Sequence, residues 1–187
     1  MDFAACLIAP DGAGAKRWQG GSPERDEEDK GMRTAYKVLA YLVAIGVAVQ
    51  AASIAYGFFG LISWVEEGGT FDQSSLRGSE VGGHIGFLTH GIGGVIVVPA
   101  IALLFLISSF FAKIPGGIKW ALIVFGVTVL QVGLGLLSLF VAGLGWLHGL
   151  NALALFGTAM LAATRVPRAV AASTAAEEEP VAESALT

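Results

Sequence analysis

Three long segments of the sequence contain no Asp, Glu, Lys or Arg, and they constrain the fold more than any other feature. They cover residues 38–65, 81–112 and 120–164. Each is longer than the roughly 20 apolar residues with which a helix crosses the hydrocarbon core of a bilayer. Only 14% of the chain is charged, against roughly 25% in soluble domains. This distribution excludes a soluble enzyme, and the single cysteine excludes a disulfide scaffold.

Four transmembrane helices account for these segments, because the longest one is interrupted by glycines at 143–145. A Pro-Gly-Gly turn at 115–117 separates the second span from the third. Pro99 lies inside the second span, and we expect it to kink that helix. The sequence therefore predicts an all-α integral membrane protein built as a bundle of four transmembrane helices. The predicted spans are 36–64, 82–111, 117–141 and 145–164.

Charges outside the spans predict the orientation. Lys and Arg in short loops mark the cytoplasmic side, and the loop 65–81 has only Arg77 among four acids. We therefore expect this loop to be external, both termini to be cytoplasmic, and the protein to lie in the cell membrane. The polar leader 1–35 and the Ala- and Glu-rich tail 165–187 are expected to be disordered, and Met32 is an alternative start. The basic residues on the cytoplasmic side are Lys30, Arg33, Lys37, Lys113, Lys119, Arg165 and Arg168.

A short motif occurs twice in the chain. It reads Leu-Thr-His-Gly-Ile at 88–92 and Trp-Leu-His-Gly-Leu at 146–150. The span before each copy carries a glutamine in an apolar run, Gln50 in the first and Gln131 in the third. These features favour two helical hairpins related by an axis along the membrane normal. The repeat rests on a likeness of only a few residues.

All three histidines, His84, His90 and His148, fall within or at the edge of a predicted span. Ionisable side chains inside a bilayer are costly and usually face the bundle interior, a cavity or a partner. The second and fourth spans both run from outside to inside, so we expect His90 and His148 at similar depth in the outer leaflet. His84 lies nearer the outer surface, where it either reaches the rim of a bound cofactor or caps the start of the second span.

Two interpretations of the histidine pair follow. Imidazole is a haem ligand, and four-helix bundles hold cofactors with inward side chains. His90 and His148 are then the iron ligands, Gly93 and Gly94 leave a slot for a flat macrocycle, and Asn151 lies one turn from His148. The alternative is that the small and polar stripes are packing seams, across which histidine and glutamine hydrogen-bond.

The segment 130–161 resembles the third and fourth helices of a half-unit of the haem A synthase family. It carries a Gln- and Gly-containing helix, a short loop, and then a helix that opens with His148 in the pattern His-x-x-Asn. The segment 89–97, THGIGGVIV, resembles the family's other ligand helix, in which glycine follows the histidine by three residues. Small, uncharacterised four-helix bacterial membrane proteins share this pattern. The resemblance implies a b-type haem ligated by His90 and His148.

The chain departs from the family in two respects. The family has two four-helix units, and this chain has one. It also lacks the acidic residue and the arginine that flank the family's first ligand, since Phe87 and Leu88 precede His90 and Gly91 follows it. Catalysis is therefore not carried over, and whether the protein is an enzyme stays open, with the balance against it.

The expected function is electron transfer, haem handling or a place in a respiratory assembly. A haem-free accessory membrane subunit is the alternative, and a small transporter or channel ranks last because no acid or arginine lies within a span. The expected partners are the lipid bilayer and either a membrane protein complex or a second copy of the chain. Nucleic acid is not expected, because no basic patch is interleaved with aromatic residues.

Overall fold

The protein is described by a computed structural model that covers residues 23–70, 72, 75 and 80–184. The ends of the predicted leader and tail, and Arg77 in the external loop, lie outside the described residues. The described chain is all-helical, as the sequence predicts. Its helices are α1 (Pro23–Glu66), α2 (His84–Ile92), the π-helix η2 (Gly93–Val97), α3 (Val98–Phe111), α4 (Gly117–Ser138) and α5 (Leu144–Ser184).

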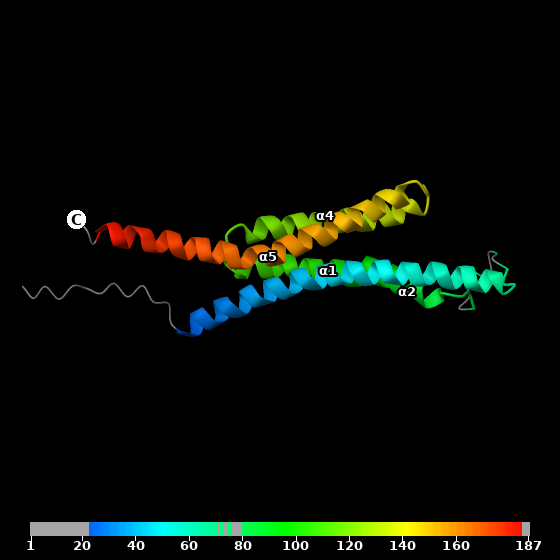
Figure 1. The fold of residues 1–187 in the computed structure, drawn as a ribbon, viewed down its shortest axis with the longest axis horizontal. Helices are drawn as coiled ribbons and strands as arrows, with labels where there is room; N and C mark the ends of the chain where they lie inside the picture. Colours follow the sequence, from blue (N-terminus) through cyan, green and yellow to red (C-terminus); the bar gives the residue numbers. More distant parts are fainter. Residues whose placement is uncertain (1–22, 71, 73–74, 76–79, 185–187) are drawn as a thin grey trace, which may run out of the picture.

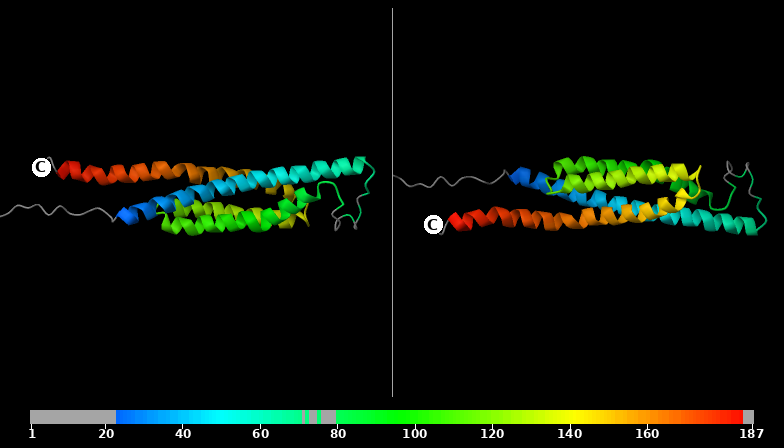
Figure 2. Two further views of the ribbon diagram at one scale, coloured as in Figure 1. Left: turned by 90° about the horizontal axis from the view of Figure 1, so that it is seen from below. Right: turned by 90° about the horizontal axis from the view of Figure 1, so that it is seen from above.

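These helices form two antiparallel hairpins that lie side by side (Figures 1 and 2). The first hairpin pairs α1 with the continuous stretch α2–η2–α3, and the second pairs α4 with α5. The beginning of α1 and the end of α5 lie at the same end of the bundle (Figure 1). We call the half of the bundle nearest to them the terminal half, and the half nearest the α1–α2 loop the loop half.

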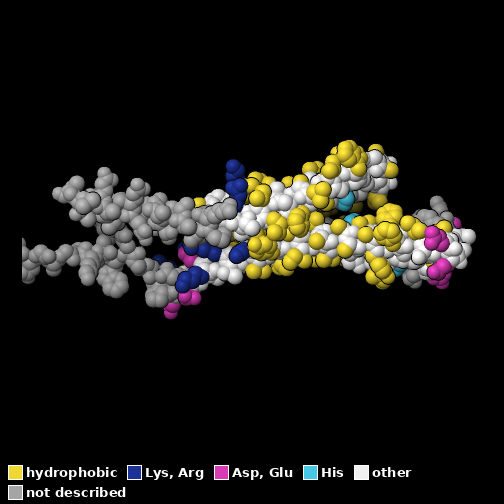
Figure 3. All heavy atoms as spheres, in the orientation of Figure 1, with side chains coloured by type: hydrophobic (Ala, Val, Ile, Leu, Met, Phe, Trp, Pro, Cys, Tyr) yellow, Lys and Arg dark blue, Asp and Glu magenta, His cyan; other side chains and the backbone are white. Residues whose placement is uncertain are grey.

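Four stretches are long and apolar enough to cross a membrane, and their surfaces are largely apolar side chains (Figure 3). Phe59 on α1 is 75% exposed and Phe140 after α4 is 85% exposed. Water-soluble monomers rarely expose apolar patches of such extent, whereas in a bilayer these side chains meet lipid. The chain is therefore a multi-pass membrane protein. The four stretches are Glu27–Glu66, His84–Phe111, Gly117–Ser138 and Leu144–Val166.

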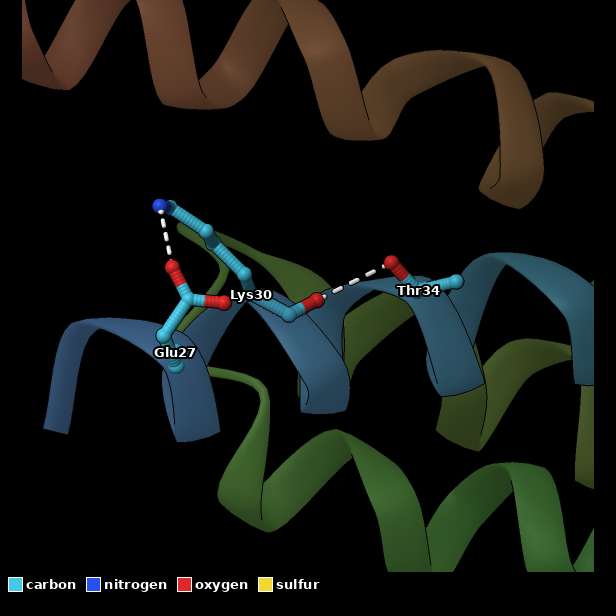
Figure 4. Close-up of polar contacts among 3 residues, drawn as sticks. All are labelled: Glu27, Lys30 and Thr34. Carbon is cyan, nitrogen blue, oxygen red and sulfur yellow. Dashed lines mark hydrogen bonds and ion pairs between the residues drawn. The ribbon is translucent and has the colours of Figure 1, made fainter. Parts of the chain in front are cut away.

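Two helices continue into segments that were expected to be disordered, the leader 1–35 and the tail 165–187. Helix α1 begins at Pro23, and α5 ends at Ser184. Extending an existing helix needs no new nucleus, and the helical parts of the two segments contain the helix-forming residues Glu (leader) and Ala and Glu (tail). On α1, the Lys30 ammonium donates to the Glu27 carboxylate at 2.9 Å, and the Thr34 hydroxyl donates to the Lys30 carbonyl at 3.0 Å (Figure 4).

Buried side chains gather in the terminal half of the bundle. There the Tyr36 ring of α1 packs on Phe105 of α3 with centroids 4.6 Å apart, and its hydroxyl donates to the Gly117 carbonyl at 3.0 Å. Small side chains let membrane helices approach closely. The buried alanines of this core are Ala40, Ala44, Ala102, Ala112, Ala121, Ala159, Ala162 and Ala163. The core cluster of the described residues does not extend into the loop half, and there the two hairpins separate (Figure 1).

Glycines bring α1 and α2 into backbone contact within the first hairpin. A methyl group on Gly86 would collide with the Ser53 carbonyl and with Gly57, and one on Gly83 would collide with the Gly57 carbonyl. Gly83 also has a left-handed φ of 79°, which glycine adopts without steric cost. Part of the glycine face on the helix that carries His90 therefore packs against a neighbouring helix.

The second span is interrupted by the π-helix η2 rather than at Pro99 itself. The Val98 N–H donates to the Gly93 carbonyl, five residues back. Pro99 lies in the first turn of α3, where it has no N–H to donate and its ring crowds the preceding turn. The wider π turn accommodates the proline, and it lies just before Pro99, where the kink was expected.

The contact between α1 and α2 predicts a selective cost for a single methyl group. We expect Gly86→Ala to lower the free energy of unfolding by about 1–3 kcal/mol, because the added carbon meets backbone atoms that have little room to move. Gly126→Ala on α4 is the matched control, since nothing lies within 4 Å of its added carbon. Unfolding followed by circular dichroism in detergent measures both, and equal stability of the two variants would contradict the packing described here.

Candidate functional site

A cavity of about 590 Å³ lies between the hairpins in the loop half. All four spans contribute to its walls, which are mostly apolar side chains and glycine. Val98, Thr128 and Leu155, buried next to the terminal-half core, close one side of it. The volume falls within the range of about 300–1,000 Å³ that is typical of small-molecule and cofactor sites. The polar residues of the lining are Gln50, His90, Thr128, Gln131 and His148.

His90 and His148 meet at this cavity. Their ring centroids are 6.1 Å apart, and the ring planes are inclined by 69°. His90 lies in the last turn of α2, and His148 lies near the start of α5. Histidine side chains are visible in the opening between the hairpins (Figure 3). The structure thus brings together the two residues that the sequence singles out as iron ligands.

Each of the two rings is held by a backbone carbonyl of the preceding helix. His90 Nδ1 lies 3.0 Å from the Gln50 carbonyl oxygen, and His148 Nδ1 lies 3.0 Å from the Gln131 carbonyl oxygen. A carbonyl oxygen only accepts, so Nδ1 carries the proton in both rings, and in a neutral ring Nε2 keeps its lone pair. Metal-ligating histidines adopt this arrangement, in which the second nitrogen donates to a carbonyl or carboxylate.

A small hydrogen-bond network surrounds His148 Nε2. The Asn151 amide donates to the Gln131 side-chain oxygen at 2.7 Å and to the Val127 carbonyl at 3.1 Å. The bond from Asn151 to Gln131 orients the Gln131 carboxamide so that its NH₂ group faces His148. Gln131 Nε2 lies 3.1 Å from His148 Nε2. Because that group only donates, His148 Nε2 accepts, which agrees with a proton on Nδ1.

The Gln50 carboxamide is less well satisfied than that of Gln131. It donates to the Thr89 carbonyl at 3.4 Å, while its Oε1 is buried without a hydrogen-bond partner. It packs on Gly93, where a side chain would collide with its Nε2. Gly93 therefore makes room for a glutamine of α1, whereas Gly91 and Gly94 line the cavity.

Two other sequence candidates, Asn151 and His84, do not line the cavity. Asn151 acts through its hydrogen bond to Gln131 and is not part of the lining. His84 is the first residue of α2, whose N-cap is Gly83, and the described chain shows no side-chain cap at this helix start. The sequence places Thr128 and Gln131 on one polar stripe of the third span without assigning either to a site, and the carbonyl contacts of Gln50 and Gln131 could not be predicted from it.

No family model, curated protein or solved structure matches the chain in the comparisons with known proteins. The resemblance to haem A synthase therefore stays a prediction from the sequence. The described residues also contain no group of three or more His, Cys, Asp and Glu side chains that could hold a metal ion by themselves. A haem iron, which is already held by its macrocycle, needs only one or two axial side chains.

The carbonyl contacts predict the tautomer of two histidines. In ligand-free protein near neutral pH, we expect His90 and His148 to carry their proton on Nδ1, because each faces a carbonyl oxygen. Imidazole ¹⁵N chemical shifts in detergent, assigned with single histidine substitutions, measure this directly. His84, for which no side-chain hydrogen bond is found in the described chain, serves as the reference. A proton on Nε2 of either ring would refute the assignment.

Proposed function

We propose that the protein binds one b-type haem in the cavity between its hairpins, with His90 and His148 as axial ligands. The observation that carries this proposal is the pair of imidazoles at a cofactor-sized apolar cavity, each with Nδ1 bonded to a carbonyl. His90 and His148 would hold the iron of the haem, and their rings already lie 6.1 Å apart, centroid to centroid, at the cavity.

The residues around the rings prepare them for ligation in different ways. No hydrogen bond of His90 Nε2 is found among the described residues, so its lone pair is available. His148 Nε2 accepts from Gln131, and Gln131 must release it before His148 can bind iron. The Asn151 amide also donates to the Val127 carbonyl, so it keeps this hydrogen-bond partner when the Gln131 side chain turns away.

We propose electron transfer as the role that suits two axial imidazoles. A haem supplies a one-electron redox couple, and two protein ligands leave no open coordination position for oxygen chemistry. The apolar walls exclude water and favour uptake of the macrocycle from the lipid phase. Haem handling, or a place in a respiratory assembly, would use the same site. A membrane protein that co-purifies with the chain would identify a respiratory assembly.

We also propose a two-hairpin repeat and a membrane orientation. The repeat is supported by the matching contacts of His90 with Gln50 and of His148 with Gln131. The orientation is supported by Lys and Arg side chains that gather at the terminal end of the bundle (Figure 3), because positive residues stay on the cytoplasmic side. The chain termini are then cytoplasmic, and the histidine pair lies in the outer leaflet.

Haem binding is tested by the optical spectrum of protein purified in mild detergent from cells supplied with haem. We expect a Soret band with the narrow visible bands of a six-coordinate low-spin haem. His90→Ala and His148→Ala should each weaken haem retention at least about tenfold, since a direct ligand matters no less than the outer-shell groups whose loss costs 10–100-fold.

His84→Ala is the matched control, because it removes a histidine of the same helix that does not line the cavity. Its spectrum should equal that of the unmodified protein.

The haem-free accessory subunit is the second candidate, and the bond from Gln131 that already satisfies His148 favours it. It predicts a colourless protein whose histidine variants change only stability or association with partners, and that result would exclude the haem site.

The orientation is tested by labelling introduced cysteines on intact cells, in a background where Cys6 is replaced by serine. We expect Glu66→Cys, at the loop end, to react with a membrane-impermeant maleimide from outside. Lys119→Cys, at the terminal end, should react only after permeabilisation, because basic loops stay inside. The reverse pattern would overturn the proposed sidedness.

A further inference from the structure

A second cavity of about 380 Å³ lies at the terminal end of the bundle, far along α1 and α5 from the histidine pair. It is formed by the first turns of the α1 span, the turn before α4, the start of α4 and the end of the α5 span. Tyr36, Trp120 and Arg165 provide its polar and aromatic lining, and the remaining walls are apolar. Tyrosine and tryptophan at the ends of membrane spans mark the level of the lipid headgroups.

Arg165 contacts an aromatic ring, and no acidic partner for it is found among the described side chains. Its guanidinium carbon lies 4.5 Å from the centroid of the Trp120 ring, a cation–π contact that orients the side chain beside the cavity. The ion pairs found in the described chain are Lys30 with Glu27 and Lys113 with Asp29, so neither acid neutralises Arg165. The guanidinium is thus free to bind an anion.

Further positive charge surrounds this cavity. Lys37 and Lys119 neighbour the lining residues Tyr36 and Trp120 in the sequence, and the described chain provides no acidic partner for either lysine. Arg33, one turn before Tyr36, has a buried Nε without a hydrogen-bond partner. Of the remaining acids of α1 with described side chains, Glu24 and Glu28 precede Tyr36 by at least two helical turns, and Glu66 is the last residue at the opposite end of the helix.

We propose that this cavity binds the headgroup of an anionic phospholipid, with Arg165 contacting the phosphate and the apolar walls contacting the glycerol and the first acyl carbons. Guanidinium is the side chain best suited to phosphate, because its planar fork donates two parallel hydrogen bonds. Basic pockets between transmembrane helices bind acidic headgroups in this way. The proposal is independent of the haem site and holds for a haem-free protein.

The test is a titration of detergent-purified protein with three probes, read by the shift of its unfolding temperature and by lipid retention in native mass spectrometry. The probes are phosphatidylglycerol, phosphatidylcholine with the same acyl chains, and inorganic phosphate. We expect only phosphatidylglycerol to raise the unfolding temperature and to stay bound. Equal effects of the two lipids would overturn the proposal, and an equal shift from inorganic phosphate would show a free-anion site instead.

Three variants localise the effect. Arg165→Gln should weaken phosphatidylglycerol binding about tenfold, the loss expected for one charge-assisted contact. Arg165→Lys keeps the charge and should lose less, which separates a lost anion contact from damage to the fold. Lys113→Gln is the matched control, because it removes a cation of the same end that pairs with Asp29 and does not line the cavity. Unchanged binding by folded Arg165→Gln, or an equal loss in Lys113→Gln, would overturn the site.

Discussion

Close packing at the terminal end of the bundle is the constraint on which the rest of the structure depends. Helices in lipid gain little from burying apolar surface against one another, so their association relies on close van der Waals contact and on hydrogen bonds. The alanine-rich core provides the first, and the bond from Tyr36 to the Gly117 carbonyl provides the second. Because the buried core joins the hairpins in the terminal half, they diverge in the loop half, and the cavity at His90 and His148 is the space that results.

The histidine pair is positioned by the backbone rather than by other side chains. A carbonyl oxygen inside a helix already accepts the N–H one turn onward, and its second lone pair accepts the imidazole Nδ1–H. Both rings use this contact at the same distance, although the loops of the two hairpins differ greatly in length. The glutamine side chains then differ in their surroundings, since Gln131 is bonded to Asn151 and His148, whereas Gln50 leaves its oxygen unsatisfied.

The bilayer makes the spans predictable from the sequence, because crossing it requires long apolar segments. Span ends at Phe111 and Gly117 follow from the loss of apolar residues at a turn, whereas the helical continuations outside the membrane extend helices that already exist. The role of each glycine on the helix of His90 cannot be predicted from the sequence, because a glycine can serve two purposes. At Gly86 it allows the backbone of α1 to approach closely, and at Gly94 it forms part of the cavity wall. The carbonyl contacts of the imidazoles leave no mark in the sequence, since every residue has a carbonyl.

The π-helix η2 has a consequence for the rotational phase of the ligand helix. A π turn accommodates one residue more than an α turn, and one residue of α-helix corresponds to a rotation of about 100°. His90 precedes η2, and the residues that anchor the second span in the core, such as Phe105, follow it. If Gly93–Val97 became regular α-helix at unchanged length, His90 would rotate by about 100° relative to the anchoring core, away from His148, whereas deleting one residue as the α-helix formed would preserve its direction. The π turn thus absorbs one residue and keeps the imidazole in phase with the half of the helix that packs in the core.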